Sequence, residues 1–274
     1  MTRMEQLKEF LRKLSGGGIA LAFSGGADSS FLLAALKELC DERPFPLKAL
    51  TMQTVFQAED ELADARRTAA GLGMDLEVFR CDPLQLPEIR NNPPDRCYRC
   101  KHFIFSRFLD FCRTHGIKTL LDGTNADDLH VYRPGRKALR ELGVVSPLAE
   151  LGFTKAEIRQ LAEERGLKFA SKPSAPCLAT RFEYGTELTP ELLKRTAAGE
   201  ALLRRLLPEN TDIRLRVQGK IARIEVTPSA MEAVLANRKT ITAGLRKLGF
   251  EFITLDLEGF RSGCYDKTRE EQIL

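Results

Sequence analysis

The chain has 274 residues, of which 43% are hydrophobic and 29% charged. That composition is typical of globular proteins with a real core and excludes a disordered chain. The net charge of +4 is compatible with anionic small molecules, and no run of five like charges offers a basic arm for nucleic acid. At roughly 150 residues per domain, the length favours two domains.

The N-terminal residues 1–14 interleave charges with leucines, a pattern that predicts an amphipathic helix rather than a signal peptide. No segment has the length and apolarity of a membrane span, so we expect no membrane association. The seven cysteines are odd in number and irregularly spaced, which argues against a disulfide framework. We therefore expect a reducing, cytoplasmic location in which clustered thiols serve chemistry.

The first 165 residues or so alternate apolar runs with amphipathic stretches, which is the βαβ rhythm of a parallel sheet. Thr154 and Glu157 are spaced as a capping box at the start of one predicted helix. We expect strands at 18–23, 47–53, 75–79 and 118–122, and helices at 28–40, 59–72, 100–115 and 154–165.

The pattern changes after residue 170. Residues 170–188 hold several Pro, Gly, Ser and Thr residues and predict a long loop, followed by a helix at 190–206. Residues 213–217 and 221–226 alternate apolar and polar side chains around a Gln-Gly-Lys turn, which predicts a β-hairpin. We expect an α/β nucleotide domain at 1–167 and a smaller α+β domain at 168–274.

The sharpest motif is Ser-Gly-Gly-Ala-Asp-Ser-Ser at 24–30, between a predicted buried strand and a helix. Two glycines let the backbone approach a ligand closely, and the helix start offers unpaired N–H groups that suit phosphate. The Walker A pattern is absent, whereas S-G-G-x-D-S matches PP-loop enzymes, which split ATP into AMP and pyrophosphate. We expect ATP phosphates to bind Ser24, Gly25, Gly26, Asp28, Ser29 and Ser30.

A second segment, Asp-Gly-Thr-Asn-Ala-Asp-Asp at 122–128, follows the fourth predicted strand. Carboxylates at a strand end are hard oxygen ligands for Mg²⁺ carried by phosphates, so Asp127 and Asp128 are candidate ligands. The alternative is a solvated helix start capped by Asn125 or Asp127. A comparable segment faces the nucleotide in PP-loop enzymes, so the two motifs support each other.

Cys97 and Cys100 form a C-x-x-C motif flanked by Arg96, Arg99 and Lys101 at a predicted helix start. Both the helix terminus and the cations favour thiolates. Such a pair can bind zinc, share an iron–sulfur cluster, form a redox couple or be inert. Cys177 lies in the long loop, where its surroundings permit either packing or chemistry.

In the predicted hairpin, Arg214 and Arg216 share one face, and Arg223 and Glu225 share a face of the returning strand. Three arginines around one glutamate can grip an anion bidentately. The alternative is a solvated strand face with surface salt bridges.

With these segments assembled, the chain resembles the LarE family, which makes the pyridinium bisthiocarboxylate mononucleotide of the nickel-pincer cofactor. The matching stretches are S-G-G-A-D-S-S, N-P-P-D-R-C-Y-R-C-K, D-G-T-N-A-D-D, P-C-L-A-T-R and R-L-R-V-Q-G-K-I-A-R-I-E, and they run in order along nearly the whole chain. The resemblance implies an ATP-dependent sulfurtransferase that forms homo-hexamers. It also implies that Cys177 bears the sulfur and that Arg181, Arg214, Arg216 and Glu225 line the substrate site.

Family members with a cysteine only at this position surrender its sulfur and end as dehydroalanine. This chain also has Cys97 and Cys100, so it resembles the type in which three cysteines hold a [4Fe-4S] cluster with one iron open for an extra sulfide. The implied reaction adenylates a substrate carboxylate with Mg²⁺ and ATP. Cluster sulfide or Cys177 itself then converts it to a thiocarboxylate.

Three rival functions follow from the same residues. A tRNA thiolase would need a basic, aromatic-decorated surface or a zinc module, and the chain has no tryptophan. An amide-forming synthetase fed by ammonia leaves the cysteines unexplained. A non-catalytic nucleotide-binding module would bind ATP without releasing pyrophosphate.

Overall fold

The computed structural model describes residues 1–57, 59–130, 134–167, 169, 176–209, 211–261 and 265. Its contacts divide the chain into two compact units. Unit 1 comprises Met1–Asp82 and Asp95–Ala175, and unit 2 comprises Pro83–Pro94 and Pro176–Leu274. The two units interleave along the chain, whereas the expected domains were contiguous. The boundary near residue 168 stays a prediction, because 168 and 170–175 lie outside the described residues.

Unit 1 contains a parallel sheet in the strand order β3-β2-β1-β4, which confirms the predicted α/β class. The strand bounds agree closely with the apolar runs of the sequence. The strands are β1 (Ile19–Ala22), β2 (Leu47–Gln53), β3 (Leu76–Arg80) and β4 (Thr119–Leu121).

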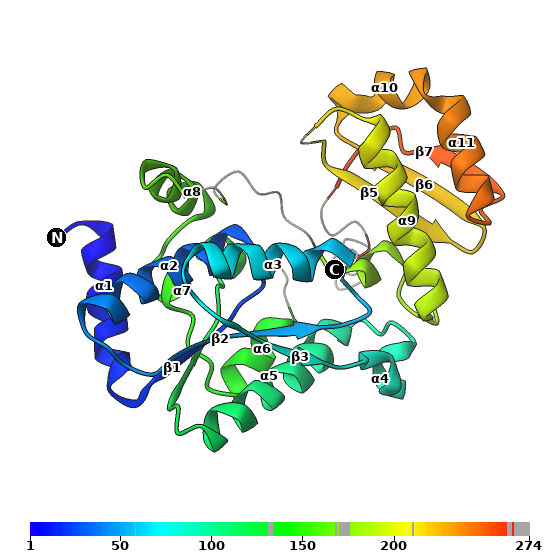
Figure 1. Cartoon of the computed structure of the whole chain (residues 1–274). Coiled ribbons are helices and arrows are strands. Elements are labelled where there is room, and N and C mark those ends of the chain that lie inside the picture. Colours follow the sequence, from blue (N-terminus) through cyan, green and yellow to red (C-terminus); the bar gives the residue numbers. More distant parts are fainter. Residues whose placement is uncertain are drawn as a thin grey trace. The chain divides into compact units, whose positions relative to one another are not determined.

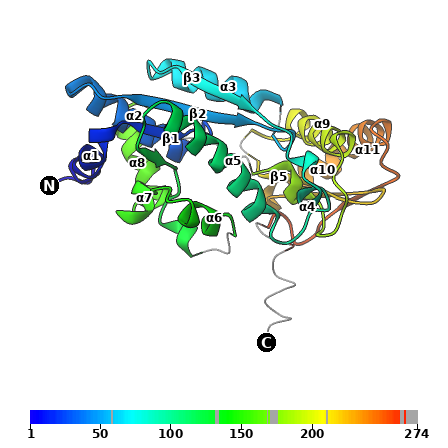
Figure 2. The ribbon, with the colours of Figure 1, turned by 90° about the horizontal axis from the view of Figure 1, so that it is seen from below.

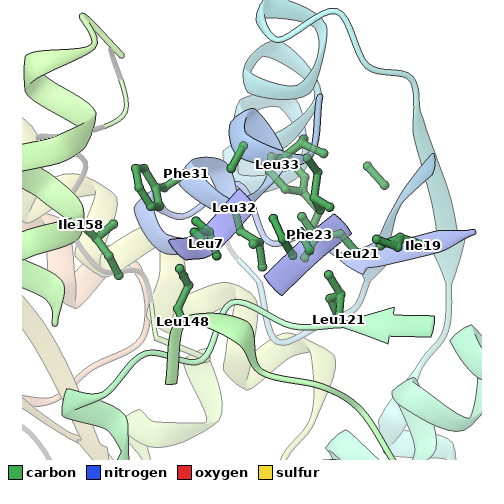
Figure 3. Close-up of a cluster of buried hydrophobic side chains, with 14 of the residues drawn as sticks. Leu7, Ile19, Leu21, Phe23, Phe31, Leu32, Leu33, Leu121, Leu148 and Ile158 are labelled. Atoms are coloured by element: carbon green, nitrogen blue, oxygen red, sulfur yellow. The ribbon is translucent and has the colours of Figure 1, made fainter. Parts of the chain in front are cut away.

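Helices cover both faces of this sheet because β1 is apolar on both sides (Figures 1 and 2). Ile19 and Leu21 join the core that includes residues of α1, α2, α3, α7 and α8, part of which is drawn in Figure 3. Ala20 faces the opposite core, which includes residues of α5 and α6. The helices are α1 (Arg3–Leu14), α2 (Ala27–Glu42), α3 (Glu59–Gly71), α5 (Arg96–Thr114), α6 (Gly135–Glu141), α7 (Pro147–Glu150) and α8 (Lys155–Glu164).

Two capping boxes define helix starts in unit 1, one at α1 and the other at α8. Thr154 and Glu157 form the box that the sequence predicted. The carboxylate of Glu157 also accepts from the Arg3 guanidinium at 2.6 Å, so the box of α8 is tied to α1. In contrast, α5 begins at Arg96, four residues before the predicted start. The preceding Pro93-Pro94 pair sets that limit, because the residue before a proline avoids the helical region.

Unit 2 is built around a second, smaller sheet in the order β5-β6-β7. The predicted hairpin is present as β5 (Ile213–Gln218) antiparallel to β6 (Ile221–Val226), and β7 (Phe252–Leu255) adds in parallel. Its helices are α4 (Pro87–Arg90), α9 (Pro190–Leu206), α10 (Met231–Ala236) and α11 (Arg238–Lys247), with short 3₁₀ turns at Pro83–Gln85 (η2), Leu178–Arg181 (η4) and Pro228–Ala230 (η5).

None of the helices in the described ranges combines the length and the apolarity that a bilayer crossing requires.

Candidate active site

The Ser/Gly loop connects β1 to α2 at the carboxyl end of a parallel strand, where open α/β sheets bind ligands. Gly25 adopts a φ of +71°, and a Cβ there would lie 2.8 Å from the Cα of Ala65 on α3. Only glycine satisfies both constraints. The N-cap of α2 is Gly26, which offers no side chain to cap the first-turn N–H groups. The loop therefore presents backbone donors of the kind that bind phosphate.

Hydroxyl groups hold this loop in shape. The Oγ atoms of Ser24 and Ser29 lie 3.1 Å apart, and the Ser29 hydroxyl donates to the carbonyl of Gly26 at 3.1 Å. The Gly26 N–H donates to Ser24 Oγ at 3.3 Å. The loop is thus preorganised by its own side chains.

The segment after β4 packs directly on this loop. A Cβ at Gly123 would lie 3.0 Å from the Cα of Ser29, so the two backbones touch. The Asn125 amide donates to Asp28 Oδ2 at 3.0 Å, and Asn125 Oδ1 accepts from the N–H of Asp128 at 3.2 Å. Asp122 accepts from the hydroxyls of Thr124 and Ser146. The two sequence motifs therefore form one site.

A cavity of about 330 Å³ opens between these motifs, a size typical of small-molecule sites. One part of its wall is polar and contains residues of both motifs, and the other is apolar. The polar wall includes Ser24, Gly26, Asp28, Ser29, Asp122, Gly123, Thr124 and Asp128, and the apolar wall includes Leu50, Met52, Ile104, Phe105 and Phe108. Such a division suits a nucleotide with a flat base and charged phosphates.

Three carboxylates and one ammonium group face this cavity. Burial raises the pKa of Asp28, against the hydrogen bond from Asn125 and the charge of Lys155, which lower it. Asp128 lies 3.8 Å from Lys155 Nζ. Lys101 is the one cation among the described residues that line the cavity. Within the described ranges, no three His, Cys, Asp or Glu side chains are grouped so that they could hold a metal ion.

The remaining predicted nucleotide residues occupy other places. Ser30 is fully buried in α2 and does not line the cavity. Asp127 is exposed, and its carboxylate accepts from the N–H of Lys155 at 2.8 Å at the start of α8. In the sequence, Lys101 stands out only as a cation beside the C-x-x-C motif and Asn125 only as a possible helix cap, and Asp122 has no role of its own within the second motif. For Lys101, the i, i+3, i+4 spacing to Ile104 and Phe105 was the available signal, since all line the cavity from one face of α5.

Cys97 and Cys100 lie in the first turns of α5, three residues apart and hence on one face. Both are half-buried. The Arg96 guanidinium, which is itself buried, donates to Cys97 Sγ at 3.3 Å. The next residue, Lys101, lines the cavity, so the cysteine pair adjoins the nucleotide site along the chain.

Three other cysteines lie in different surroundings. Burial raises the pKa of Cys112 to about 11, and burial also raises the pKa of Cys81. Cys40 donates to the carbonyl of Phe45 at 3.4 Å. Raised pKa values disfavour thiolate chemistry at these two cysteines. Cys112 instead belongs to the hydrophobic core that includes Phe105 and Phe108. Cys264 lies outside the described residues.

Unit 2 carries the predicted arginine cluster on one face of its hairpin. The strand register sets Arg214 opposite Glu225 and Arg216 opposite Arg223. Arg216 donates from Nε to Glu225 Oε2 at 2.9 Å and from Nη1 to the carbonyl of Thr180 at 2.6 Å. Glu225 is fully buried and also accepts from Arg223 at 3.2 Å. These charges form an internal network rather than a solvated face.

Arg181 forms a second buried pair, with Glu200 of α9. The guanidinium donates twice to that carboxylate, at 2.8 and 2.9 Å, and only 2% of the arginine is exposed. Its Nη1 also donates to the carbonyl of Cys177 at 3.3 Å. Glu200 is buried, which opposes ionisation, yet hydrogen bonding to Arg181 lowers its pKa. Arg181 therefore fixes the backbone at Cys177, the N-cap of η4.

Arg214 differs from its neighbours. It is buried, and no carboxylate in the described part of the chain lies within ion-pair distance. Its Nη1 donates to the carbonyl of Ile213 at 2.7 Å, and its guanidinium lies 4.8 Å from the ring centroid of Phe260. Burial, followed by the charge of Arg181, lowers its pKa to about 10.

Comparisons with known proteins identify the family of this chain. Residues 1–130 match the PP-loop domain family. A pyridinium-3,5-bisthiocarboxylic acid mononucleotide synthase from Lactiplantibacillus plantarum is 34% identical over 251 residues, covering 91% of this chain and 89% of that protein. An uncharacterised protein from Synechocystis is 33% identical over 264 residues, 96% of each chain. A tRNA-specific 2-thiouridylase from Thermotoga neapolitana is 27% identical over 192 residues, covering 56% of this chain and 54% of that protein. The chain therefore belongs to the LarE family of PP-loop proteins and is an ATP-dependent sulfurtransferase.

Proposed function

We propose that this enzyme adenylates a carboxylate of a pyridinium-3,5-dicarboxylate mononucleotide and replaces carboxylate oxygen with sulfur. The observation that carries the proposal is the cavity of unit 1, where the Ser/Gly loop and the Asp122–Asp128 segment meet beside the helix that begins with Cys97 and Cys100. The relative from L. plantarum is named for a bisthiocarboxylic acid product, and such a product is made from a dicarboxylate by this exchange.

The adenylation step uses the polar wall of the cavity. A carboxylate oxygen of the substrate attacks the α-phosphorus of ATP, the bond to the β-phosphate oxygen breaks, and pyrophosphate leaves. Backbone N–H groups of the loop and the start of α2 stabilise the phosphate charge. Asp28 and Asp128 are the carboxylates that we assign to phosphate-bound Mg²⁺, and we assign Lys101 to the phosphates themselves.

We further propose that Cys97, Cys100 and Cys177 hold a [4Fe-4S] cluster. The half-buried pair on one face of α5, with Arg96 donating to Cys97, fits two thiolate ligands. When bound, such a cluster supplies an open iron position for an additional sulfide. In the alternative route, the Cys177 thiolate attacks the acyl carbon, AMP leaves, and elimination of the thiocarboxylate converts Cys177 to dehydroalanine.

Unit 2 would bind the acceptor through Arg214, which is buried and lies beyond ion-pair distance of the carboxylates in the described ranges. We assign Arg216, Arg223 and Glu225 to shaping that anion site, and Arg181 to holding the backbone of Cys177. A homo-hexamer and a cytoplasmic location complete the proposal, and sedimentation of the purified enzyme tests the former.

The test is a direct assay. The anaerobically purified enzyme is incubated with ATP, Mg²⁺ and the pyridinium dicarboxylate mononucleotide, and AMP, pyrophosphate and acceptor mass are followed. We expect pyrophosphate release that depends on the acceptor, and an acceptor whose mass reports oxygen-to-sulfur exchange. The proposal would be contradicted if pyrophosphate were released at the same rate with and without the acceptor and the acceptor gained no sulfur.

A tRNA thiolase is the second candidate, favoured by the match to a tRNA-specific 2-thiouridylase over 56% of this chain. The same assay with unmodified tRNA in place of the pyridinium acceptor separates the two. Thiolated nucleoside in the tRNA digest would favour this alternative.

A further inference from the structure

The segment Pro83–Pro94 lies between β3 and α5 in the sequence, yet it belongs to unit 2. Backbone hydrogen bonds fasten it to the loop that follows η4, for example from the N–H of Leu188 to the carbonyl of Arg90 at 2.8 Å. Three residues after its end, the chain reaches Cys97. The residue that makes most of these contacts to the loop is Asn92.

Asn92 is fully buried and has a φ of +46°, the one positive φ at a non-glycine position in the described ranges. Its amide Nδ2 donates to two backbone carbonyls, that of Glu183 at 2.7 Å and that of Phe182 at 3.2 Å. Its own carbonyl accepts from the N–H of Gly185 at 3.1 Å. A left-handed asparagine persists where the surroundings over-determine it, and such strain gathers at functional sites.

The loop that Asn92 holds is itself firmly anchored. Phe182 is buried and forms a β-bridge with Val217 of β5. The preceding residue, Arg181, makes the buried pair with Glu200. Phe182 follows Cys177 by five residues, just as Asn92 precedes Cys97 by five. The hydrogen bonds of Asn92 therefore join the chain shortly before one thiol to the chain shortly after another.

We propose that Asn92 is a positioning residue for sulfur transfer, which limits how far Cys97 and Cys100 can move from Cys177. The inference rests on the proposed function, in which these thiols act together. Five residues reach at most about 18 Å when extended. While Asn92 is hydrogen-bonded to Phe182, Cys97 therefore stays within that distance of Asn92, and Cys177 within that distance of Phe182. Without the two side-chain bonds, the backbone bonds that Gly185 and Leu188 donate become the nearest described links, so the tether to Cys177 grows from five residues to eight and the effective concentration of one thiol at the other falls.

Asn92→Gly tests this role without disturbing the backbone, because glycine accepts the positive φ. Asn91→Gly is the matched control, since Asn91 is the exposed neighbour. For each variant we would measure AMP formation, thiocarboxylate formation and the yield of a Cys97–Cys177 or Cys100–Cys177 bridge formed by a short bis-maleimide, read by peptide mass mapping. The melting temperature is recorded in parallel.

We expect Asn92→Gly to reduce thiocarboxylate formation about tenfold, with a matching loss of bridging, while AMP formation stays within about twofold of wild type. Asn91→Gly should match wild type in every measurement. Unchanged bridging and sulfur transfer in Asn92→Gly would overturn the proposal. So would a parallel loss of AMP formation, which marks a general structural role. If wild type makes no thiocarboxylate, the proposed function fails, yet the bridging yield still decides the role of Asn92.

Discussion

The amide of Asn125 donates a hydrogen bond of 3.0 Å to the carboxylate of Asp28, across 97 residues of sequence. This bond joins the two nucleotide motifs, and it sets the charge of a buried acid. Burial raises the pKa of Asp28, and Asn125 works in the opposite direction by stabilising the carboxylate. Asn125 therefore offsets part of the rise that burial causes in the pKa of Asp28, the carboxylate that we propose binds phosphate-bound Mg²⁺.

Asp28→Ala and Ser29→Ala should abolish AMP and pyrophosphate formation while the fold stays intact, because both side chains line the phosphate end of the cavity. Ser30→Ala is the control. The Ser30 hydroxyl is buried, has no hydrogen-bond partner and is absent from the cavity wall, so its removal should leave activity unchanged. Undiminished pyrophosphate release in both active-site variants would refute the assignment. Loss of activity in Ser30→Ala would show that Ser30 also takes part in the reaction.

Asp28→Asn should raise the melting temperature at neutral pH although it removes activity. An acid whose folded-state pKa is raised above its ordinary value of 3.8 contributes stability below that value and loses it as the pH rises through the folded pKa. The ionised group therefore costs stability at neutral pH, and asparagine removes that cost. Melting curves should show a gain that shrinks as the pH falls toward 4. A gain that is constant with pH would show that ionisation is not its source.

Asp128→Asn should raise the Mg²⁺ concentration needed for half-maximal pyrophosphate release by about tenfold, which corresponds to roughly 1.4 kcal/mol. The neighbouring Asp127→Asn should leave the requirement unchanged, because that carboxylate accepts from the N–H of Lys155 instead of lining the cavity. A Mg²⁺ titration of both variants checks this. Equal shifts in the two would show that both carboxylates bind the metal.

Arg214→Ala should weaken acceptor binding by roughly 2–5 kcal/mol without affecting ATP binding, because it removes a buried cation that forms no ion pair with a carboxylate of the described residues. Arg216→Ala should instead unfold unit 2 more readily, by roughly 3–5 kcal/mol, since it strips a partner from the fully buried Glu225. Calorimetric titration and urea denaturation separate the two effects. Unchanged acceptor affinity in Arg214→Ala would leave that arginine a packing residue.

Cys97→Ala and Cys100→Ala should each eliminate brown absorbance and bound iron from anaerobically reconstituted protein, while pyrophosphate release survives. The reason is that cluster ligands are cysteine thiolates, whereas the nucleotide cavity is built from other side chains. Cys40→Ala is the control, because Cys40 donates to a backbone carbonyl elsewhere in unit 1. If wild type is colourless and only Cys177→Ala loses sulfur transfer, the sacrificial route is the correct one, and Cys177 should then lose the mass of hydrogen sulfide after turnover.

Local patterns were sufficient for the sheet and the hairpin. The alternation of Ile19, Ala20 and Leu21 between two cores can be predicted from the two-residue period of a strand alone. The Ser/Gly loop can be predicted from its glycines. Partners distant in sequence could not be predicted. From the sequence, Glu200 is indistinguishable from the other charged residues of α9, and only the fold shows that it is buried against Arg181. Asp127 and Asp128 are indistinguishable in sequence. Only tertiary packing places Asp128 in the cavity wall and Asp127 against the backbone N–H of Lys155.

Unit 2 is formed from two stretches of chain that are separated by part of unit 1, and this affects the order in which its parts are synthesised. Residues 83–94 leave the ribosome long before the loop at 182–188 to which they hydrogen-bond. At roughly 5–20 residues per second, they wait at least several seconds for these partners, and unit 1 is synthesised in full during that time. The chain cannot be cut once to yield two autonomous halves, because a C-terminal fragment beginning at 176 lacks Asn92 and the helix α4. Such a fragment should be insoluble when expressed alone and should recover its structure only with a peptide spanning 83–94.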